Sequence, residues 1–473
     1  MRTGTIRLAT TKLRYPMHQT VIDLAPTLSS YGAAVPTHQV HIAQGALAAA
    51  GDFMAQALPA GRWHLIADAH TWPLVGSQLA DQLRAKHRPY TCHIFQEDHL
   101  RPEIKIAKRL SERLEGSSAA VAIGAGTVND LVKMASFHAD IPYACIATAP
   151  SMNGYTSAMA ALLEEGVKTT RPCAAPIAVL ADIDLLTAAP YRMIAAGFGD
   201  LISKPVSQAD WLLSHYLLDT PYSPEAAQLI DQSAHLLEGV AERLPSRSPD
   251  VVGKLMGSLL LSGLSMAVAG TSAPSSGGEH LISHYLDMTH YAWGCPADLH
   301  GCQVGVATLT AAALYEKLLA LDLSKIDHTR RVSEHAPWYT YREVIRARFS
   351  SLTSAVLPFA QQGYPSTEEL TERFYQLRVQ WPLIAEALEK TLLPARHIGD
   401  QLKAAGGPTS FAQLGATPGR ARCAILHSKD IRPRYTLLHL LNELGVLESW
   451  TTAVLREQNL LWPARSSCPK AEQ

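Results

Sequence analysis

The sequence predicts an α/β N-terminal domain built on a mainly parallel sheet, followed by an all-α C-terminal domain. From about residue 40 to 190, short apolar runs alternate with amphipathic stretches of helical length, which is typical of βα units. Beyond about 190, stretches rich in Ala, Leu and Glu have a helical period. Because 473 residues exceed what one hydrophobic core usually organises, we place two domains, at residues 1–190 and 191–473.

Four apolar runs in the first domain mark its strands. The predicted strands are Trp63–Ala67, Ala119–Ile123, Tyr143–Ala147 and Ile177–Leu180, and the predicted helices cover 76–86 and begin at Val128. Each strand is followed by a polar or glycine-rich loop, and the third leads into the loop TAPSMNGYTS. Since α/β sheets bind ligands at the carboxyl ends of their strands, these loops are candidate binding positions.

The composition excludes several protein classes. The 41 Lys and Arg residues balance 42 Asp and Glu residues, so no overall positive charge attracts nucleic acid. Seven cysteines, an odd number without a CxxC pair, favour reduced thiols and a cytoplasmic location. The N-terminus lacks the apolar core of a secretory signal, and the stretch Leu255–Gly270 is too short and too rich in Gly and Ser to span a bilayer. We therefore expect a soluble enzyme with no nucleic-acid or membrane partner and a buried core helix over Leu255–Gly270.

Gly124 and Gly126 lie between a predicted strand and a predicted helix in VAIGAGTVNDLVK. Glycines there let backbone NH groups approach a ligand while the helix N-terminus favours a phosphate, so the loop is a candidate for the pyrophosphate of a dinucleotide. The alternative is a tight turn in which Thr127 is the N-cap and Asp130 completes a capping box. The residues alone leave both interpretations open.

Two charged residues near this loop are further candidates for cofactor binding. Lys133 lies on the first turns of the same helix and can point toward an anion, although a lone helix lysine is usually solvated. Asp68, at a strand end, is placed to accept hydrogen bonds from the adenosine ribose.

Three segments hold residues of metal-ligand type: GFGDLISK, SSGGEHLISHYLDM and DLHGCQVGVATL. A carboxylate and two imidazoles suit zinc, nickel or ferrous iron, and three protein ligands leave a position open for substrate. A dication there would stabilise the alkoxide that forms as an alcohol loses its proton. In a chain with 20 histidines, however, the four-residue spacing of His280 and His284 often arises without a metal. Cys302 is a competing soft ligand, but we expect a buried structural thiol there.

These segments resemble, in order, the conserved blocks of glycerol-1-phosphate dehydrogenases, a branch of the iron-containing alcohol dehydrogenase and dehydroquinate synthase superfamily. The matching blocks are GAGTVNDLVK, TAPSMNGYTS, DIDLLTAAPYRMIAAGFGDLISK, SGGEHLISHYLDM, LHGCQVGVATL and ILHSKDIRPRYTLLHLLNELGVL, which cover roughly residues 40 to 450. The resemblance implies a Rossmann-like NAD(P)-binding domain, a helical domain and an active site in the cleft between them. It also implies metal-dependent hydride transfer between NAD or NADP and a small polyol or polyol phosphate, such as glycerol-1-phosphate and dihydroxyacetone phosphate.

The resemblance assigns roles residue by residue. Asp200, His280 and His300 match the ligands of one divalent metal, which is zinc, nickel or iron. Positions that match the pyrophosphate loop are Gly124, Gly126 and Thr127, and positions that match the lining of the nicotinamide and substrate are Thr148, Ser151 and Tyr155.

Two further matches concern the chemistry at the substrate. Lys204 stands where several iron-type relatives have a fourth ligand histidine, which implies a three-ligand site and leaves Lys204 free to meet an anionic substrate group. His284 matches a histidine near the reacting alcohol in relatives, so it is either a proton relay or a structural residue of a helix face.

At two positions that would contact the substrate, this sequence differs from the family's usual residues. Asn153, in SMNGY, replaces an acidic residue that contacts the substrate or the metal-bound water, and Ala273, in SAPSSG, replaces an arginine whose fork would suit a phosphate. These two departures motivate the hypothesis of a non-catalytic homologue. A lyase or cyclase that uses NAD transiently, like dehydroquinate synthase, is another alternative, although that branch has Glu where this chain has Asp200. We also expect a homo-oligomer.

Overall fold

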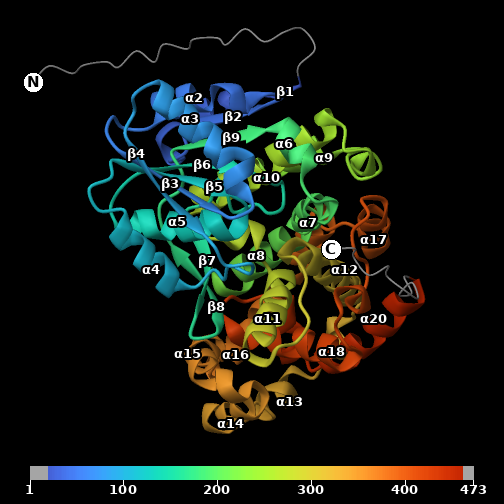
Figure 1. The fold of residues 1–473 in the computed structure, drawn as a ribbon. Helices are drawn as coiled ribbons and strands as arrows, with labels where there is room; N and C mark the ends of the chain where they lie inside the picture. The colour runs from blue at the N-terminus through green and yellow to red at the C-terminus, as the bar shows by residue number, and fades with distance from the viewer. Residues whose placement is uncertain (1–19, 462–473) are drawn as a thin grey trace, which may run out of the picture.

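A computed structural model, which describes residues 20–461, has an α/β part formed by the first half of the chain and a helical part formed by the second half (Figure 1). This arrangement confirms the predicted fold class. Two predictions concern residues outside this range. The prediction that the N-terminus carries no secretory signal rests on residues 1–19, and Cys468 is one of the seven cysteines expected to be reduced.

Seven strands form the main sheet. They are β1 (Val21–Ile22), β2 (Gln39–Ala43), β3 (Trp63–Asp68), β4 (Tyr90–Phe95), β5 (Ala119–Gly124), β6 (Tyr143–Ala147) and β9 (Ala178–Asp182). Their order is β1-β2-β9-β6-β5-β3-β4, and only the pair β1 and β2 is antiparallel. The four predicted strands are confirmed as β3, β5, β6 and β9. Sequence reasoning missed β2 and β4, which mix polar and apolar residues and are only partly buried.

Helices cover both faces of this sheet. On one face lie α2 (Ala50–Ala57) and α3 (Ser77–Ala85), which pack on side chains of β3, β5 and β6. On the other face lie α4 (Ile104–Arg113), α5 (Gly126–His138) and α10 (Pro249–Ala269). The helices predicted over 76–86 and from Val128 are confirmed as α3 and α5, although α5 begins two residues earlier than expected.

Helix α10 belongs to the second half of the chain but packs into the core of the first. Its Met256 and Leu260 are fully buried in the same cluster as Ile42 of β2 and Val179 of β9. By length and composition α10 is apolar enough to cross a membrane, yet most of it is buried inside the protein. The predicted core helix over Leu255–Gly270 is therefore confirmed, whereas the domain boundary at residue 190 stays a prediction.

The remaining described helices lie beside or below the sheet in Figure 1. They are α1 (Ala25–Tyr31), α6 (Ile183–Ala188), α7 (Tyr191–Leu201), α8 (Lys204–Leu218), α9 (Pro224–Leu237), α11 (Gly278–Trp293), α12 (His300–Leu319), α13 (His328–Ser333), α14 (Trp338–Phe349), α15 (Thr353–Gly363), α16 (Thr367–Thr391), α17 (Ala395–Ala404), α18 (Pro418–His427), α19 (Leu437–Glu443) and α20 (Leu447–Leu461). Most of them share one large apolar core, which explains the helical period of the second half.

Helices α7 and α12 cross at glycines. A Cβ atom on Gly301 would lie 1.8 Å from the carbonyl oxygen of Ala196, and one on Gly199 would lie 2.3 Å from the carbonyl oxygen of Gly301. Only glycine allows two backbones to approach this closely. Since Gly199 precedes Asp200 and Gly301 follows His300, the crossing places two of the predicted metal ligands side by side.

A two-stranded hairpin, β7 (Met159–Glu164) and β8 (Val167–Pro172), extends from the α/β part toward α11 (Figure 1). Its two turn residues, Glu165 and Gly166, both have positive φ, as a type I′ turn requires. Sequence reasoning missed this hairpin, although the two-residue loop ending in glycine was a signal for it.

Candidate functional site

A cavity of about 190 Å³ lies where the two halves meet. Its wall combines the loops after β5 and β6, the hairpin, and the helices α11 and α12. The lining includes Gly126, Thr127, Asn153, Lys168, Thr170 and the imidazoles of His280, His284 and His300. A cavity of this size is small compared with typical ligand pockets, so it fits a small polar molecule or one end of a larger one.

His280 and His300 line this cavity, and the fully buried Asp200 lies directly behind His280. His280 Nε2 lies 3.5 Å from Asp200 Oδ1, and the ring centres of His280 and His300 are 5.2 Å apart. Two imidazoles bound tetrahedrally to one ion, with metal to nitrogen distances near 2 Å, have ring centres about 5 Å apart. The structure thus brings together three side chains that are far apart in the sequence, since 100 positions separate Asp200 from His300.

Each imidazole is oriented by a neighbour on α11. Glu279 Oε1 lies 2.7 Å from His280 Nδ1, and Ser283 Oγ lies 3.0 Å from His300 Nδ1. Holding Nδ1 in this way leaves Nε2 of each ring available as a ligand, which is the usual outer arrangement around a metal-binding histidine. Sequence reasoning missed Glu279 and Ser283. The only signal for them was their position immediately before His280 and His284.

Lys204 corrects one sequence prediction. Its side chain is buried, and Nζ lies 3.0 Å from Asp200 Oδ1 while also donating to Ser203 Oγ and to the carbonyl oxygen of Ser275. Lys204 is therefore not free to meet an anionic substrate group. Burial alone would raise the pKa of Asp200, but the Lys204 ammonium and His280 hold it well below its usual range.

The donor set nevertheless fits a divalent cation. Asp200 Oδ2 accepts a hydrogen bond of 2.9 Å from the backbone NH of Asn153, so the carboxylate is fixed with Oδ1 toward His280. Within the described part of the chain, no three His, Cys, Asp or Glu side chains already stand at metal-binding distances. The Lys204 ammonium lies beside Oδ1 instead, so a cation bound to that oxygen has to displace it.

Asn153 also has a structural contact. Its side-chain Nδ2 donates to Ser262 Oγ of α10 at 3.1 Å, while the residue lines the cavity. The Asn153 side chain, which replaces the acidic residue of the family pattern, thus connects the loop after β6 to α10.

His284 lies in the cavity wall with an unpaired nitrogen. Its ring stacks on that of His300 at 5.7 Å, and its buried Nδ1 has no hydrogen-bond partner among the described residues. Burial, followed by the charges of Arg432 and Lys168, holds the pKa of His284 well below 6.5, so the ring is neutral near pH 7. Because buried polar atoms normally have partners, this nitrogen favours a proton relay over a purely structural histidine.

The glycine loop connects the end of β5 to the N-terminus of α5, as in sites where a helix N-terminus binds an anion. Helix α5 begins at Gly126 with Ala125 as its N-cap, so the capping box predicted for Thr127 and Asp130 is wrong. A Cβ atom on Gly124 would lie 2.7 Å from the Cβ of Val128, which explains the need for glycine at the strand end. Gly126 and Thr127 line the cavity at the helix N-terminus, where an anion is favoured.

Lys133 is neither solvated nor directed at an anion. Its fully buried Nζ donates to the carbonyl oxygens of Gly154 and Met159 and to Ser157 Oγ, so it holds the loop after β6. Asp130 Oδ1 lies 3.6 Å from Lys133 Nζ, and burial raises the pKa of the Asp130 carboxyl group. The predicted role of Lys133 in binding an anion is therefore wrong, while Asp130 does line the cavity.

Three predicted residues of the loop after β6, Thr148, Ser151 and Tyr155, do not line this cavity. Tyr155 is fully buried and donates to the carbonyl oxygen of Ala149 at 2.7 Å, so its predicted place against the nicotinamide is wrong. The backbone NH of Thr148 donates to the carbonyl oxygen of Gly124 and joins this loop to the glycine loop. Cofactor contacts of Thr148 and Ser151 stay predictions.

Two other residues have local contacts. Asp68 Oδ1 accepts from the backbone NH groups of His70 and Thr71 and closes a turn after β3, and its contact with a ribose stays a prediction. Cys302 is buried, and burial raises its pKa to about 12, so the thiol stays protonated and is a poor ligand.

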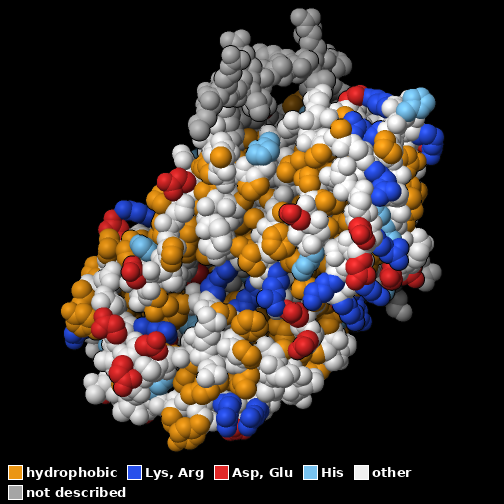
Figure 2. All heavy atoms as spheres, turned by 90° about the vertical axis from the view of Figure 1, so that its left-hand side faces the viewer, with side chains coloured by type: hydrophobic (Ala, Val, Ile, Leu, Met, Phe, Trp, Pro, Cys, Tyr) orange, Lys and Arg blue, Asp and Glu red, His pale blue; other side chains and the backbone are white. Residues whose placement is uncertain are grey.

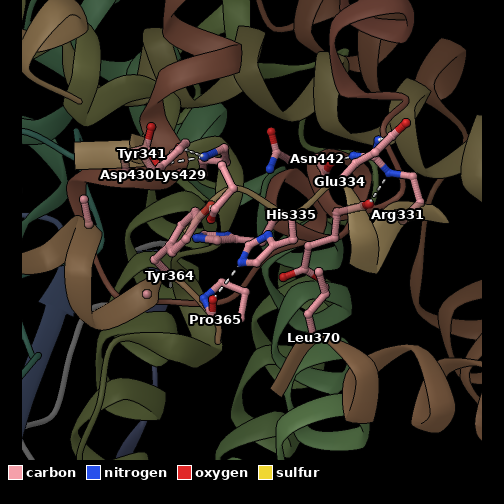
Figure 3. A pocket seen from close by; sticks show the side chains of 15 residues that line it. Arg331, Glu334, His335, Tyr341, Tyr364, Pro365, Leu370, Lys429, Asp430 and Asn442 are labelled. Atoms are coloured by element: carbon pink, nitrogen blue, oxygen red, sulfur yellow. Dashed lines mark hydrogen bonds and ion pairs between the residues drawn. The ribbon is translucent and has the colours of Figure 1, made fainter. Parts of the chain in front are cut away.

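A second cavity, of about 180 Å³, lies in the helical half and shares no lining residue with the first (Figure 3). Tyr341 and Tyr364 stack on one side of it, and the Lys429 ammonium lies 2.7 Å from Asp430. Arg331 likewise pairs with Glu334. The charges that line this cavity thus include two ion pairs, a buried one between Lys429 and Asp430 and a partly exposed one between Arg331 and Glu334.

Known proteins resemble the chain over most of its length. The sequence profile described as iron-containing alcohol dehydrogenase matches residues 41–190. A glycerol-1-phosphate dehydrogenase of Bacillus subtilis that uses NAD(P)+ is 32% identical over 383 residues, which cover 80% of this chain and 84% of that protein. A protein of the same name from Halalkalibacterium halodurans is 36% identical over 383 residues, with 80% and 86% covered.

Solved structures agree in fold. A probable glycerol dehydrogenase from Sinorhizobium meliloti matches with a TM-score of 0.58 over 90% of this chain and 98% of its own. At 14% sequence identity this likeness supports the two-part architecture alone.

Proposed function

Because this chain belongs to the glycerol-1-phosphate dehydrogenase family, we propose that it interconverts glycerol-1-phosphate and dihydroxyacetone phosphate by hydride transfer with NAD or NADP. The chain is an NAD(P)-linked, metal-dependent oxidoreductase of the iron-containing alcohol dehydrogenase class. One observation supports the proposed reaction above all others: His280 and His300 line a cavity that the glycine loop also lines, and Asp200 lies 3.5 Å from His280.

In this proposal, Asp200, His280 and His300 hold one zinc, nickel or iron ion. Such a cation supplies Lewis-acid stabilisation of the negative charge that develops as the alcohol loses its proton. Glu279 and Ser283 keep both imidazoles turned toward the cavity, and this orientation supports a ligand role over ordinary surface histidines. The ammonium of Lys204 must move away from Asp200 when the cation binds.

Gly126 and Thr127 place the pyrophosphate of the cofactor at the N-terminus of α5. The helix dipole and the free backbone NH groups of its first turn favour a negative charge there. Asp68, Asp130, Thr148 and Ser151 remain candidates for contacts with the rest of the cofactor.

His284 accepts the alcohol proton in this proposal. A neutral imidazole with an unpaired Nδ1 in the cavity wall can take up a proton and pass it on, and its stacking on His300 fixes its distance from the predicted metal site. Asn153 orients the substrate through its side-chain oxygen, since its Nδ2 is already bonded to Ser262.

The proposed location is the cytoplasm, in the form of a homo-oligomer. The six cysteines of the described residues are all unpaired, which supports a reducing compartment. Size-exclusion chromatography with light scattering measures the oligomeric state directly.

The test uses protein stripped of metal and then loaded with zinc, nickel or ferrous iron. Glycerol-1-phosphate is added with NAD or NADP, and the reduced cofactor is followed by its absorbance. Net accumulation of NAD(P)H supports the dehydrogenase, whereas a cyclase would recycle its cofactor within each turnover. A protein stripped of metal that keeps full turnover would refute the metal role.

A matched pair of histidine variants on α11 sharpens this test. His280→Gln removes a proposed ligand, while His290→Gln changes an exposed histidine whose ring contacts the carbonyl oxygen of Cys295 and the ring of Tyr291. Metal content measured by elemental analysis is expected to fall in the first variant and to stay at the wild-type level in the second.

A further inference from the structure

The second cavity has a buried floor and a mouth that is open to solvent. Lys429 and Asp430, on the 3-10 turn Ser428–Ile431, are only 6% and 5% exposed and lie at the floor. Asn442, which is exposed, and Arg331, which is partly exposed, lie at the mouth (Figure 3). At about 180 Å³ the cavity is smaller than typical pockets for drug-sized ligands, so it fits an ion of a few atoms.

The floor carries more positive than negative charge. Lys429 Nζ lies 2.7 Å from Asp430 Oδ1, and Arg348 lies 3.2 Å from Oδ2 of the same carboxylate. One carboxylate is thus shared by two cations. Burial acts to lower the pKa of Lys429, but the Asp430 carboxylate raises it above its usual value, so the ammonium stays charged. The floor therefore keeps a net positive charge.

The charges nearer the mouth follow the same pattern. Arg331 lies 3.2 Å from Glu334 Oε2, and Arg330 lies 2.7 Å from Oε1 of the same carboxylate. Glu443, the remaining carboxylate of the wall, forms an ion pair with Arg373. Each carboxylate of this wall thus has a direct cationic partner, and two of the three have a second one. The wall therefore favours an anion.

The outer surface at this end of the molecule has no such preference. Figure 2 shows charged side chains of both signs interspersed with apolar ones at the lower end, the height at which α13, α14 and α15 lie in Figure 1. The preference for an anion therefore comes from the cavity wall itself.

Several N–H donors of the wall have no acceptor among residues 20–461. The Lys429 ammonium has three N–H groups, and two of them donate, to a carboxylate and to a phenol oxygen. Arg331 uses three of its five N–H groups. The side-chain amide of Asn442 has no protein partner in this part of the chain, and Figure 3 shows it between Lys429 and Arg331. One N–H group of Lys429, two of Arg331 and two of Asn442 are therefore available to a ligand.

This set of donors fits a tetrahedral oxyanion. The donors come from α13, from the 3-10 turn and from α19, so they reach the cavity from three sides. A carboxylate offers about four lone-pair sites on two oxygens in one plane, whereas phosphate offers acceptors on four oxygens that point in different directions. Ammonium and guanidinium groups also form strong, charge-assisted hydrogen bonds with phosphate.

The floor of the second cavity is joined to the wall of the first by a short stretch of chain. Lys429 is followed three and five residues later by Arg432 and Arg434. Arg432 donates to the carbonyl oxygen of Lys168 on β8 at 2.9 Å, and Arg434 donates to Ser272 Oγ at 2.7 Å. Since Lys168 and Ser272 line the first cavity, an ion that fixes Lys429 also restrains groups of that wall.

We propose that the second cavity is a binding site for inorganic phosphate, held by Lys429, Arg331 and Asn442, and that the bound phosphate steadies the hairpin β7–β8 beside the first cavity. The three side chains donate to the phosphate oxygens, and the phosphate neutralises the excess positive charge of the wall. Because the two cavities share no lining residue, this is a regulatory site outside the cavity of the proposed reaction.

Trp338 provides a local signal for the test. Its ring centre lies 6.2 Å from that of Tyr341 and 5.6 Å from that of Tyr364, and both tyrosines line the second cavity. Titration of the full chain with inorganic phosphate is expected to change the tryptophan fluorescence. Trp338→Phe should abolish this change while calorimetry still detects the phosphate. A wild-type Trp338 signal that does not respond to phosphate would overturn the site.

Two variants of the wall test the donors. Lys429→Met removes a charged donor and is expected to weaken phosphate binding by roughly 10-fold or more. Asn442→Asp replaces a free amide by a carboxylate that repels phosphate, for which we also expect roughly 10-fold or more. Because Asn442 is exposed and its side chain has no partner among the described residues, this variant keeps the inference testable if Lys429→Met fails to fold.

Asn459→Asp is the matched control. It makes the same charge change at another exposed asparagine, in the last turn of α20, which lines neither cavity. Its affinity for phosphate should stay within about 2-fold of the wild-type value, because the nearest effect of a surface charge is screened by salt. Equal affinities in Asn442→Asp, Asn459→Asp and the wild type would overturn the site.

Hydrogen exchange tests the link to the first cavity. Phosphate is expected to slow amide exchange in β7 and β8 in the wild type and in Asn459→Asp, but not in Asn442→Asp at the same concentration. Equal slowing in all three proteins would assign the effect to phosphate in the first cavity and would overturn the link. These measurements need no turnover, so they decide the matter even if the proposed reaction is refuted.

Discussion

The ammonium of Lys204 and the carboxylate of Asp200 form a buried ion pair of 3.0 Å between the last turn of α7 and the first turn of α8. The same carboxylate oxygen faces His280 Nε2 at 3.5 Å. The lysine therefore neutralises Asp200, and the stability of the protein without metal depends on this pair. If Asp200 holds the cation of the proposed function, Lys204 competes with that cation for Oδ1.

Lys204→Met is expected to destabilise the metal-free protein by about 3 to 5 kcal/mol, because it leaves Asp200 buried without its partner. Added Zn²⁺ should then raise the melting temperature more in the variant than in the wild type, since no ammonium has to be displaced. Differential scanning calorimetry with and without Zn²⁺ measures both effects. Lys390→Met is the control, because Lys390 and Glu386 form an exposed pair of the same spacing, for which we expect less than about 1 kcal/mol. Equal Zn²⁺ effects in wild type and Lys204→Met would contradict the competition.

Gly301→Ala is expected to weaken metal binding without touching a ligand. The added methyl group would meet the carbonyl oxygen of Ala196 at 1.8 Å, so α7 and α12 must separate and draw Asp200 away from His300. Overpacking of this kind typically costs about 1 to 3 kcal/mol of stability. Zinc affinity is measured by competition with a chromogenic chelator. Gly419→Ala on α18, where a Cβ atom would meet nothing within 4 Å, serves as the control and should keep wild-type affinity.

His284→Gln tests the proton relay. If His284 carries the proton, kcat should fall by roughly 10²-fold or more, as is typical for the loss of a general base. Added imidazole can enter the cavity of this variant and accept the proton in place of the missing side chain. Partial rescue of kcat by added imidazole is therefore the diagnostic result. A variant that loses only stability, with kcat unchanged, would show that His284 is a structural residue.

Acid is expected to destabilise the protein through His64. Burial is the main cause that lowers the pKa of His64 to about 4, and its Nε2 has no partner among the described side chains. The unfolded chain takes up this proton below pH 6.5 and the folded protein only near pH 4, so the stability contributed by neutral His64 is complete above pH 6.5 and is lost as the pH falls toward 4. The slope is at most about 1.4 kcal/mol per pH unit.

Urea unfolding between pH 4 and 7 measures this slope. His64→Phe should flatten it, whereas His70→Gln, which changes an exposed histidine, should leave it as in the wild type. An unchanged slope in His64→Phe would assign the acid sensitivity to other groups.

The strands at the centre of the sheet could be predicted because their apolar runs are continuous, as in Ala119–Ile123 of β5. Strand β4 could not, because an edge strand such as YTCHIF needs only one apolar side. The metal triad followed from the family resemblance, and no local pattern shows that α7 and α12 cross at Gly199 and Gly301.

The errors at the site have one physical cause. Lys133, Lys204 and Tyr155 were expected to face ligands, since their side chains are polar and lie in the matching blocks. In the folded protein each of them satisfies backbone or side-chain groups of the loops that form the cavity. A linear sequence gives the residue type but not the acceptor that folding brings to it.

Helix α10 makes the two halves of this enzyme mutually dependent. Its Met256 and Leu260 fill the space against Ile42 and Val179, so the α/β half cannot complete its interior from residues 1–190 alone. A truncated gene product ending at residue 190 would keep α4 and α5 but would expose the apolar side chains that α10 covers, and it would tend to aggregate. Since Leu255 and Leu259 of the same helix belong to the core of the helical half, neither half can be separated from the other without exposing one side of α10 to water.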